Sequence, residues 1–357
     1  MTCLDNISYN KIPNDIIMRY LDLYQFIGRN DTMLKIIEDD YEALTAATIR
    51  TDSYFFAQLI GLKISESRYK QLIVRDVKPK TNDEAVLRNI KRAFQKIHGE
   101  TDSFTLFSRE IQDLLKFLYK DAGTDTDLNF AKTVKKPKAS INLLSSGKKT
   151  KRDELESLIQ SYENTKKKNQ YEASFININF YLDFIQLEPF KKHNDTLAHM
   201  LHYILLIHDD FKAFHLSSFF EKLYKRREVF EKLFKDASHN YKEGLADTHD
   251  LHRFILDIAL ESYRDISEIL RNYTFDQQLN KSDYIENTIN RLPEVFTKEM
   301  IRNEHPTISE STINRTLKRL RDDKKIRPLG KGRSAKWMKL YPTQKKPSLN
   351  EQLNLKL

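Results

Sequence analysis

Hydrophobic residues recur along most of the chain with the period of an α-helix. Ile111, Leu114, Leu115 and Leu118, for example, fall at helical spacing and therefore share one face. Residues 171–187 are apolar on nearly every side, which is typical of a helix buried at the centre of a domain. The pattern therefore predicts a body of packed helices that extends to about residue 275.

The helical body is expected to have two parts, residues 1–120 and residues 121–275. The first is predicted to form successive amphipathic helices from about residue 13. The second opens with a basic segment, 132–152, which holds eight basic residues and no acidic one, and whose proline, glycine and serines favour an exposed loop. Further helices are predicted from about Asp153, over 171–187, from Asp195 to His208, from Ser217 to about Lys235, and around Leu251–Tyr263.

From residue 283 the pattern changes to short helices separated by turns. Three helices are expected, at Tyr284–Leu292, at Phe296–Asn303 and, with Ser309 as N-cap, at Glu310–Asp322. Two apolar segments follow, 326–329 and 335–340, and a Gly-Lys-Gly-Arg sequence joins them. This order predicts a winged helix-turn-helix over 280–342 with a two-stranded wing, followed by a flexible tail over 343–357.

The third of these short helices has an apolar face and a polar face. The apolar stripe is Ile313, Leu317 and Leu320, and the opposite face carries Ser311, Thr312, Asn314, Arg315, Lys318 and Arg319. A helix of this size fits the major groove of DNA, where Asn314 and Arg315 are suited to reading base edges. Lys331, Arg333 and Lys336 of the wing are suited to contacting phosphates. The sequence therefore predicts double-stranded DNA as a partner; the alternative is a winged helix that contacts only protein.

The composition agrees with a helical protein and limits its chemistry. Only 8 glycines and 9 prolines occur in 357 residues, which is low for a β-rich protein. Cys3 is the single cysteine, which excludes an intramolecular disulfide and a cysteine-based zinc site, and no metal site is expected. The chain lacks a secretory signal pattern and a membrane-spanning apolar stretch, so a cytoplasmic protein without a membrane partner is expected. The net charge of +9 is modest, and the basic excess lies in 132–152 and 314–339.

The order of the central helices resembles the Fic (filamentation induced by cAMP) fold. Fic enzymes are helical proteins that transfer AMP, or another phosphate-containing group, from a nucleotide to a hydroxyl of a target protein. Their signature, H-P-F-x-x-G-N-G-R, lies between two core helices, and the corresponding stretch here is E-P-F-K-K-H-N-D-T, residues 188–196. The resemblance covers about residues 13–264. It implies a mainly α fold, a Fic-like helical domain followed by a winged helix-turn-helix domain.

Several functional groups of the signature are absent from this chain. The residues that agree with it are Pro189, Phe190 and Asn194. Glu188 stands where the resemblance implies the histidine that acts as general base, and a carboxylate with an ordinary pKa of about 4.3 is a weak base. His193 and Asp195 replace two glycines that would form a phosphate-binding nest, and Asp195 adds negative charge there. Thr196 and His199 replace arginines.

The resemblance also implies two accessory elements. Many Fic proteins carry an inhibitory helix, S-x-x-x-E-G, whose glutamate pairs with the last arginine of the motif. Residues 52–62 resemble it, with Gly61 kept and Ile60 in place of the glutamate. The basic segment 132–152 falls where the family places a flap that pairs with a target protein. This segment is therefore a candidate for binding a protein partner or for a second DNA contact, and a solvated loop is the third alternative.

These features favour a protein that is not an enzyme. The predicted function is a DNA-binding transcription regulator whose catalytically degenerate Fic-like domain serves for dimerisation or for sensing a partner. A homodimer is expected because it would read two DNA half-sites with one fold, and no cofactor is expected. Two alternatives stay open: Fic-type AMP transfer with Glu188 as base, which would require ATP and magnesium, and a protein-interaction scaffold.

Overall fold

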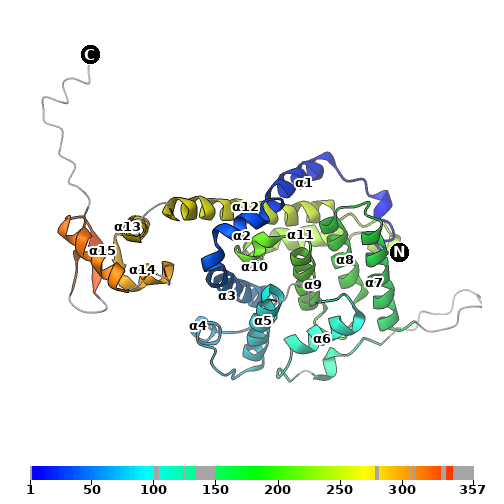
Figure 1. Cartoon of the computed structure of the whole chain (residues 1–357). Coiled ribbons are helices and arrows are strands. Elements are labelled where there is room, and N and C mark those ends of the chain that lie inside the picture. The colour runs from blue at the N-terminus through cyan, green and yellow to red at the C-terminus, as the bar shows by residue number, and fades with distance from the viewer. Residues whose placement is uncertain are drawn as a thin grey trace, which may run out of the picture. The chain divides into compact units, whose positions relative to one another are not determined.

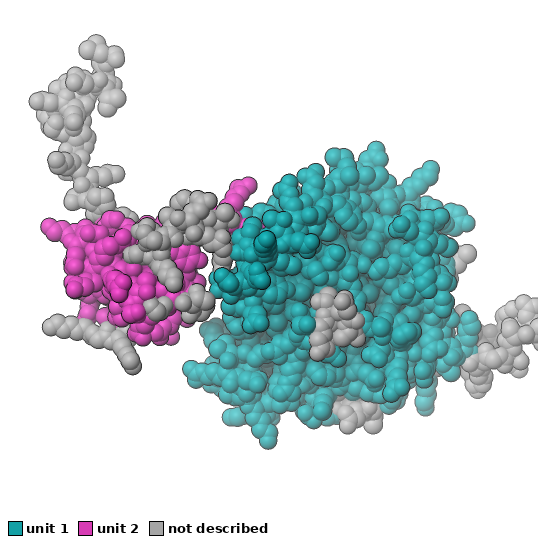
Figure 2. All heavy atoms as spheres, in the orientation of Figure 1, with its two compact units in different colours: residues 1–268 teal, residues 269–357 magenta. Residues whose placement is uncertain are grey.

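The computed structural model describes residues 2–99, 104–123, 125–132, 149–277, 281–305, 308, 310–330 and 335–340. The described residues are mainly α-helical, as the sequence predicts. The chain forms two compact units, residues 1–268 and 269–357, which are coloured separately in Figure 2. Among the described helices, none is long and apolar enough to cross a membrane.

The first unit is a bundle of helices (Figure 1). Its two most buried helices, α8 and α9, pack against each other. In the described residues its α-helices are α1 Asn14–Ile27, α2 Asn30–Ile36, α3 Tyr41–Leu59, α4 Glu66–Arg75, α5 Asn82–Gly99, α6 Ser108–Leu118, α7 Lys151–Lys167, α8 Ala173–Leu187, α9 Asn194–His208, α10 Phe219–Lys225, α11 Arg227–Ala237 and α12 His249–Gln277. α8 packs against α7 and α9, while α3 packs against α5 and α10. α12 crosses the limit between the two units.

α8 is buried on all sides, as its apolar sequence predicts. Residues 174–184 of this helix are all buried, including two asparagines and an aspartate. Each of these polar groups is hydrogen-bonded: Tyr162 donates to Asn177 (2.8 Å), Asn179 donates to the Phe175 carbonyl (2.7 Å), and the backbone amides of Cys3 and Leu4 donate to Asp183. Burial raises the pKa of Asp183 to about 6. Because buried polar groups need specific partners, these bonds fix the position of α8 and attach the N-terminal segment to it.

The side-chain carboxylate of Asp52 connects α3 to α10 by hydrogen bonds. Asp52 of α3 is fully buried, and its Oδ1 accepts hydrogen bonds from Ser218 Oγ (2.6 Å) and from the backbone amide of Phe220 (2.9 Å). The N-terminus of a helix carries unpaired amides and partial positive charge, so Asp52 caps α10 from a different helix. Burial raises the pKa of Asp52 to about 7.

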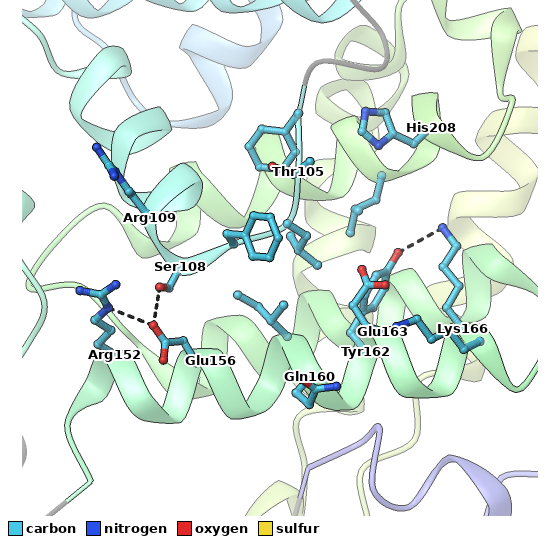
Figure 3. Close-up of a pocket in the computed structure, with 16 residues that line it drawn as sticks. Thr105, Ser108, Arg109, Arg152, Glu156, Gln160, Tyr162, Glu163, Lys166 and His208 are labelled. Carbon is cyan, nitrogen blue, oxygen red and sulfur yellow. Dashed lines mark hydrogen bonds and ion pairs between the residues drawn. The ribbon is translucent and has the colours of Figure 1, made fainter.

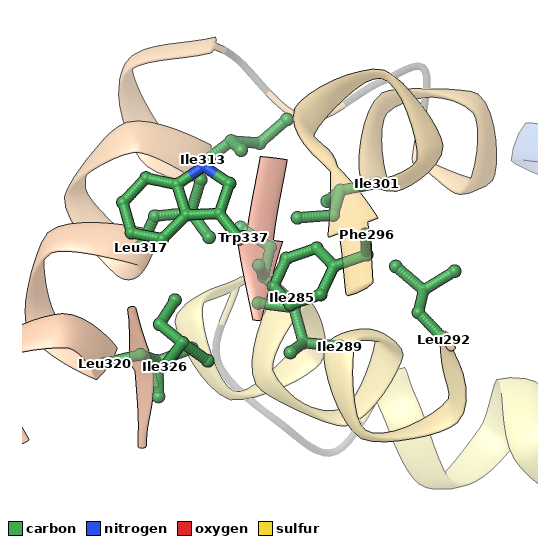
Figure 4. Packing of buried hydrophobic residues seen from close by; sticks show 10 residues of the cluster. All are labelled: Ile285, Ile289, Leu292, Phe296, Ile301, Ile313, Leu317, Leu320, Ile326 and Trp337. Carbon is green, nitrogen blue, oxygen red and sulfur yellow. The ribbon is translucent and has the colours of Figure 1, made fainter. Parts of the chain in front are cut away.

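The second unit combines short helices with a small antiparallel sheet. Its elements after α12 are α13 Lys281–Arg291, β1 Val295–Thr297, α14 Lys298–Glu304, α15 Glu310–Asp322, β2 Ile326–Pro328 and β3 Lys336–Lys339. The strands are ordered β1-β3-β2, with Phe296 opposite Trp337 and Arg327 opposite Met338. Side chains from all of these elements meet in one core, shown in Figure 4: Ile285, Ile289, Leu292, Phe296, Ile301, Ile313, Leu317, Leu320, Ile326 and Trp337.

Two helices of the first unit differ from the expectation drawn from their sequence. The single helix expected over 217–235 is divided into α10 and α11 at Arg226, which leaves the helical conformation; its side chain pairs with Glu261 of α12 (2.8 Å). The helix expected around Leu251–Tyr263 continues in α12 to Gln277, through a charged stretch that carries a weaker apolar signal.

Two further expectations of helix bounds are corrected. The helix expected over 52–62 is the end of the longer α3, which stops at Leu59 because Gly61 takes a positive φ of 74°. The helix expected over 296–303 begins later, because Phe296 lies in β1; the wing strands thus belong to a three-stranded sheet. Ser309, Lys331, Arg333, most of the basic segment (133–148) and the tail (343–357) lie outside the described residues.

Candidate functional site

The turn that corresponds to the Fic signature connects α8 to α9. Glu188 ends α8 in the left-handed conformation (φ 46°), and its side chain is exposed. Lys151, at the start of α7, donates a hydrogen bond from Nζ to the Leu187 carbonyl (2.7 Å), which satisfies one of the free carbonyls at the end of α8. The candidate general base therefore lies at the protein surface.

The first half of this turn pairs with residues 129–131. Backbone hydrogen bonds run from the Ala131 amide to the Pro189 carbonyl (2.9 Å) and from the Lys191 amide to the Asn129 carbonyl (3.1 Å). Between them the rings of Phe130 and Phe190 stack, with centroids 4.8 Å apart. The described residues that lead into the basic segment are therefore held against the motif turn.

Asn194 closes the turn on itself. Its Oδ1 accepts a hydrogen bond from the Phe190 amide (3.0 Å), and its Nδ2 donates to the Phe190 carbonyl (2.8 Å). Both ends of the carboxamide are thus used within the turn, as is common for asparagine side chains that stabilise local backbone structure. The role of Asn194 in this structure is to hold the turn that begins α9.

His193 adopts a backbone conformation that glycine favours. Its φ of 65° and ψ of 22° lie in the left-handed region, which costs a residue with a side chain roughly 1–2 kcal/mol. The imidazole stacks on Tyr119 with centroids 3.8 Å apart and planes inclined by 21°. Burial lowers the pKa of His193, so its ring is neutral at neutral pH. The turn therefore keeps the backbone of a glycine turn, while a ring occupies space that a glycine would leave empty.

Uncharged groups occupy both positions where the Fic resemblance implies arginines. Thr196 is buried, and its Oγ1 lies 3.2 Å from the hydroxyl of Tyr119. His199 Nδ1 lies 3.3 Å from the hydroxyl of Tyr181, and burial lowers the pKa of His199 to about 4. Asp195 is exposed in the first turn of α9, where it adds a carboxylate to the helix end that would otherwise attract an anion. At these three positions the chain therefore carries one carboxylate and no guanidinium group.

The segment that resembles the inhibitory helix forms the end of α3, and the chain that follows it is held to α5. Ile60 follows α3 and is half-buried, and Gly61 turns the chain toward Lys63. The Lys63 amide donates to Asp83 of α5 (2.8 Å). Burial raises the pKa of Tyr119, the tyrosine on which His193 stacks.

Several histidines of the body take part in buried hydrogen-bond networks. His252 Nε2 lies 2.9 Å from Ser174 Oγ, and its Nδ1 lies 3.4 Å from the hydroxyl of Tyr20. His215 Nδ1 lies 2.7 Å from the hydroxyl of Tyr41. Burial lowers the pKa of His252 to about 3 and that of His215 to about 4. In the part of the chain that the structure describes, no group of three or more histidine, cysteine and acidic side chains is arranged to hold a metal ion.

In the second unit, α15 turns its polar face away from the core. Asn314, Arg315 and Lys318 are exposed, whereas Ile313 and Leu317 are buried. Within the described residues, these three polar side chains make no hydrogen bond or ion pair. Ser311 is also exposed and Thr312 is half-buried, and both have contacts within the unit. α15 therefore presents amide, guanidinium and ammonium groups together on one accessible surface.

Ion pairs restrain the other charged groups of this unit. Arg319 pairs with Glu286 of α13 (2.6 Å), and Glu286 also accepts a hydrogen bond from Lys325. Arg302 of α14 pairs with Glu310 at the start of α15 (2.8 Å). Sequence reasoning missed Glu286, because its partners are more than thirty positions away along the chain. Arg319 was expected to face DNA, and the structure places it against this carboxylate.

Two further basic side chains of this unit are exposed on the sheet. Lys336 begins β3, is exposed and lies opposite Thr297 of β1. Arg327 on the neighbouring strand is also exposed. Of the wing residues that the sequence singled out, only Lys336 is among the described residues. Of the residues expected to contact DNA, the described part of the second unit therefore holds the exposed face of α15 and Lys336.

Comparison with known proteins connects the chain to Fic proteins through its fold. No family model matches the sequence, and no curated protein matches it significantly. Among solved structures, a Fic family protein from Desulfovibrio desulfuricans G20 has a TM-score of 0.54 and 12% identity, and the match covers 94% of this chain and 98% of that one. A Fic domain-containing signaling protein from Bacteroides thetaiotaomicron has a TM-score of 0.52 and 12% identity, over 70% of this chain and 98% of that one.

These similarities define the fold class. The protein has a mainly α, Fic-like fold, which confirms the fold inferred from the order of its central helices. At 12% identity the likeness is one of fold, and the chemistry of the site has to be argued from the residues present.

Proposed function

We propose that the protein is a DNA-binding regulator, and that residues 280–342 act as a winged helix-turn-helix with α15 as the recognition helix. The observation that carries the proposal is the exposed face of α15, on which Asn314, Arg315 and Lys318 stand together without intramolecular partners among the described residues. The order α13, β1, α14, α15, β2, β3 supports it, because this order places a helix pair and a two-stranded extension around one core.

The side chains of this face differ in the contacts that they suit. Arg315 lies near the centre of the outward face, and with Asn314 it can form paired hydrogen bonds with base edges. Lys318 and Lys336 are point charges suited to phosphates. Arg319 would have to leave Glu286 to contact DNA, so we assign it a role in holding α15 on α13. Within this proposal, Arg315 contributes to sequence preference and Lys318 to general affinity.

In this proposal the Fic-like body carries no nucleotidyl transfer and serves for dimerisation or for sensing a partner. Three observations support that reading: the ring of His193 fills the turn, Asp195 adds negative charge, and Thr196 is buried against Tyr119. Phosphate binding at a helix N-terminus needs open amides and favours positive charge. Glu188 itself is exposed to solvent at the end of α8.

The experiment that tests DNA binding is fluorescence anisotropy with the full-length protein, on fragments selected from a random duplex pool. Binding is expected to weaken as salt rises, because counterions are released from phosphates. Arg315→Ala should weaken binding to the selected sequence by about 1–3 kcal/mol and reduce sequence preference. Arg75→Ala removes the same charge from an exposed position in the first unit and serves as the control. Equal binding by both variants and the wild type would refute the assignment of α15.

A second candidate, Fic-type AMP transfer, is favoured by one observation: the turn at His193 keeps a glycine-like backbone. If this candidate is correct, calorimetry with ATP and magnesium will show saturable binding that weakens in Asn194→Ala. Mass spectrometry will then show AMP on the protein or a partner, and Glu188→Gln will remove it. If millimolar ATP produces no heat with a folded sample, this candidate is excluded. The remaining candidate, a protein-interaction scaffold, is supported if no duplex is bound at low salt.

A further inference from the structure

The helix α1 carries two apolar stripes, and the first unit covers only one of them. The covered stripe is Ile16, Tyr20 and Leu23, which are all buried. The second stripe is displaced by one residue along the helix, so it points about 100° away from the first. Its members are between 43% and 58% exposed: Ile17, Leu21 and Tyr24, with Met18 beside them. A helix that is apolar on two faces is expected to pack on both, and here one face has no cover within the chain that the structure describes.

The second stripe is a concentrated group of exposed apolar side chains. Outside α1, no eight consecutive described residues hold more than one exposed large hydrophobic side chain. A half-exposed side chain of this size presents on the order of 100 Å² of surface, so the four together expose about 400 Å². Because α1 lies on the outside of the bundle (Figure 1), this surface is accessible. Patches of this size on a folded protein commonly mark a site of interaction.

The charged groups of α1 favour an uncharged protein surface as the partner. Arg19 pairs with Asp15 (3.1 Å) and with Asp257 of α12 (2.8 Å). Helical spacing places Asp15 and Arg19 on the side of α1 that is turned away from the exposed stripe. The remaining charged residue of α1 is the exposed Asp22. Helices that lie on anionic membranes carry lysine and arginine on their polar face, so this acidic helix is unsuited to such a surface.

A second copy of the chain provides the surface that the stripe requires. In a symmetric pair the same patch serves on both sides, so an uncharged apolar stripe meets an uncharged apolar stripe. Two stripes bury about 800 Å² of apolar surface, which is most of the ~1,200 Å² at the lower end of specific interfaces. Asn14 and Gln25 are exposed and uncharged on the same side of α1, and they extend the contact. Leu21 is near the middle of the stripe and therefore lies next to the two-fold axis.

We propose that α1 is the dimerisation surface of this protein, and that two copies pair about a two-fold axis with the exposed stripes in contact. The inference rests on the dimerisation role proposed for the Fic-like body and names the surface that performs it. Tyr24 is already held in place for this contact, because its hydroxyl donates to Glu172 (3.1 Å). A side chain that is fixed before association loses little conformational entropy when a partner covers it.

Sedimentation equilibrium of the full-length protein without DNA tests the proposal. The wild type should form dimers at micromolar concentrations. Leu21→Glu should weaken the association by at least about tenfold, because it places a charge at the centre of an apolar contact. Val74→Glu introduces the same charge at an exposed apolar position on α4; it is the matched control and should associate as the wild type does.

Disulfide cross-linking provides a second measurement at the same position. The native Cys3 is buried, so a cysteine introduced at the surface is the one available for oxidation. Leu21→Cys should form a covalent dimer on mild oxidation, whereas Val74→Cys should remain monomeric on a denaturing gel. This measurement keeps the test available if Leu21→Glu does not fold.

The outcomes separate the dimer from DNA binding. A monomeric wild type overturns the proposal. A dimer that Leu21→Glu leaves intact, or that Val74→Glu weakens equally, overturns the assignment to α1. If the monomer binds duplex DNA in anisotropy, the dimer alone is overturned and the proposed function stands. If a dimer that depends on Leu21 binds no duplex, the proposed function is overturned and the assignment of α1 stands.

Discussion

The buried carboxylate of Asp52 should make the stability of the first unit depend on pH, and Asp52→Asn should remove that dependence. Asp52 is fully buried between α3 and α10, and only Oδ1 has hydrogen-bond partners in the described structure. Asparagine keeps an oxygen that can accept from Ser218 and Phe220, and it carries no charge. The substitution therefore imitates the protonated form of the aspartate at every pH.

The size of the effect follows from the two pKa values. Burial raises the pKa of Asp52 from 3.8 to about 7, so the folded state holds this proton more tightly than the unfolded chain. The free energy of unfolding contributed by the protonated group is therefore fully present below about pH 4. It is lost progressively as the pH rises through the folded-state pKa and is constant above it. Three pKa units correspond to about 4 kcal/mol, of which roughly 3 kcal/mol fall between about pH 5 and about pH 8.

Urea unfolding of the wild type and of Asp52→Asn across this pH range measures the effect. The variant should gain stability relative to the wild type as the pH rises, whatever its absolute stability, because only the wild type must release a proton. Comparing the two proteins at each pH cancels the contribution of other titrating groups, such as Asp183. Asp39→Asn removes a carboxylate from an exposed position before α3 and is the control for the loss of one negative charge. A constant difference between the wild type and Asp52→Asn would refute the reasoning.

Three further predictions concern the turn and the second unit. His193→Gly removes the strain of the left-handed backbone but also removes the ring that stacks on Tyr119. The free energy of unfolding should therefore change by no more than about 1 kcal/mol. A loss of about 3 kcal/mol in a urea titration would contradict this balance. Phe296→Ala should destabilise the second unit by about 3–5 kcal/mol. The single tryptophan, Trp337, packs in the same core, so its fluorescence during urea unfolding measures the change; an unfolding transition at the wild-type urea concentration would contradict the prediction. Glu286→Gln removes the ion-pair partner of Arg319. If the second unit binds DNA as proposed, its affinity for DNA should rise about twofold to fivefold in anisotropy at low salt. A decrease in affinity would instead place Glu286 in the DNA interface.

The parts of the fold that the sequence predicts well are those in which local periodicity and burial agree. α8 is apolar all round and is buried all round, and α15 has an apolar stripe that faces the core. β1 was missed because it is three residues long and only Phe296 of them is buried, which leaves no alternation to detect. The break between α10 and α11 was also missed; it falls at Arg226, whose partner Glu261 is far away in the sequence.

The candidate sites show the same division. The polar face of α15 follows from helical spacing alone, and the structure places Asn314, Arg315 and Lys318 on an exposed surface. The restraint of Arg319 by Glu286 could not be predicted, because it requires α13 and α15 to pack together. The cavity of about 750 Å³ beside α7 (Figure 3) was also missed, since its walls come from α6, α7, α9 and residues 104–107.

In the motif turn, the residues that match the Fic signature and the residues that differ from it have different roles in the structure. The signature residues that this chain keeps are those that hold the backbone: Pro189 accepts a strand-like hydrogen bond, Phe190 stacks on Phe130, and Asn194 closes the turn. The positions that differ are those whose groups would act on a nucleotide, and the turn tolerates their replacement. His193 even accepts the conformation of a glycine, because stacking on Tyr119 offsets part of its cost. This difference between the kept and the replaced residues supports our proposal that the function of this chain lies in its binding surfaces.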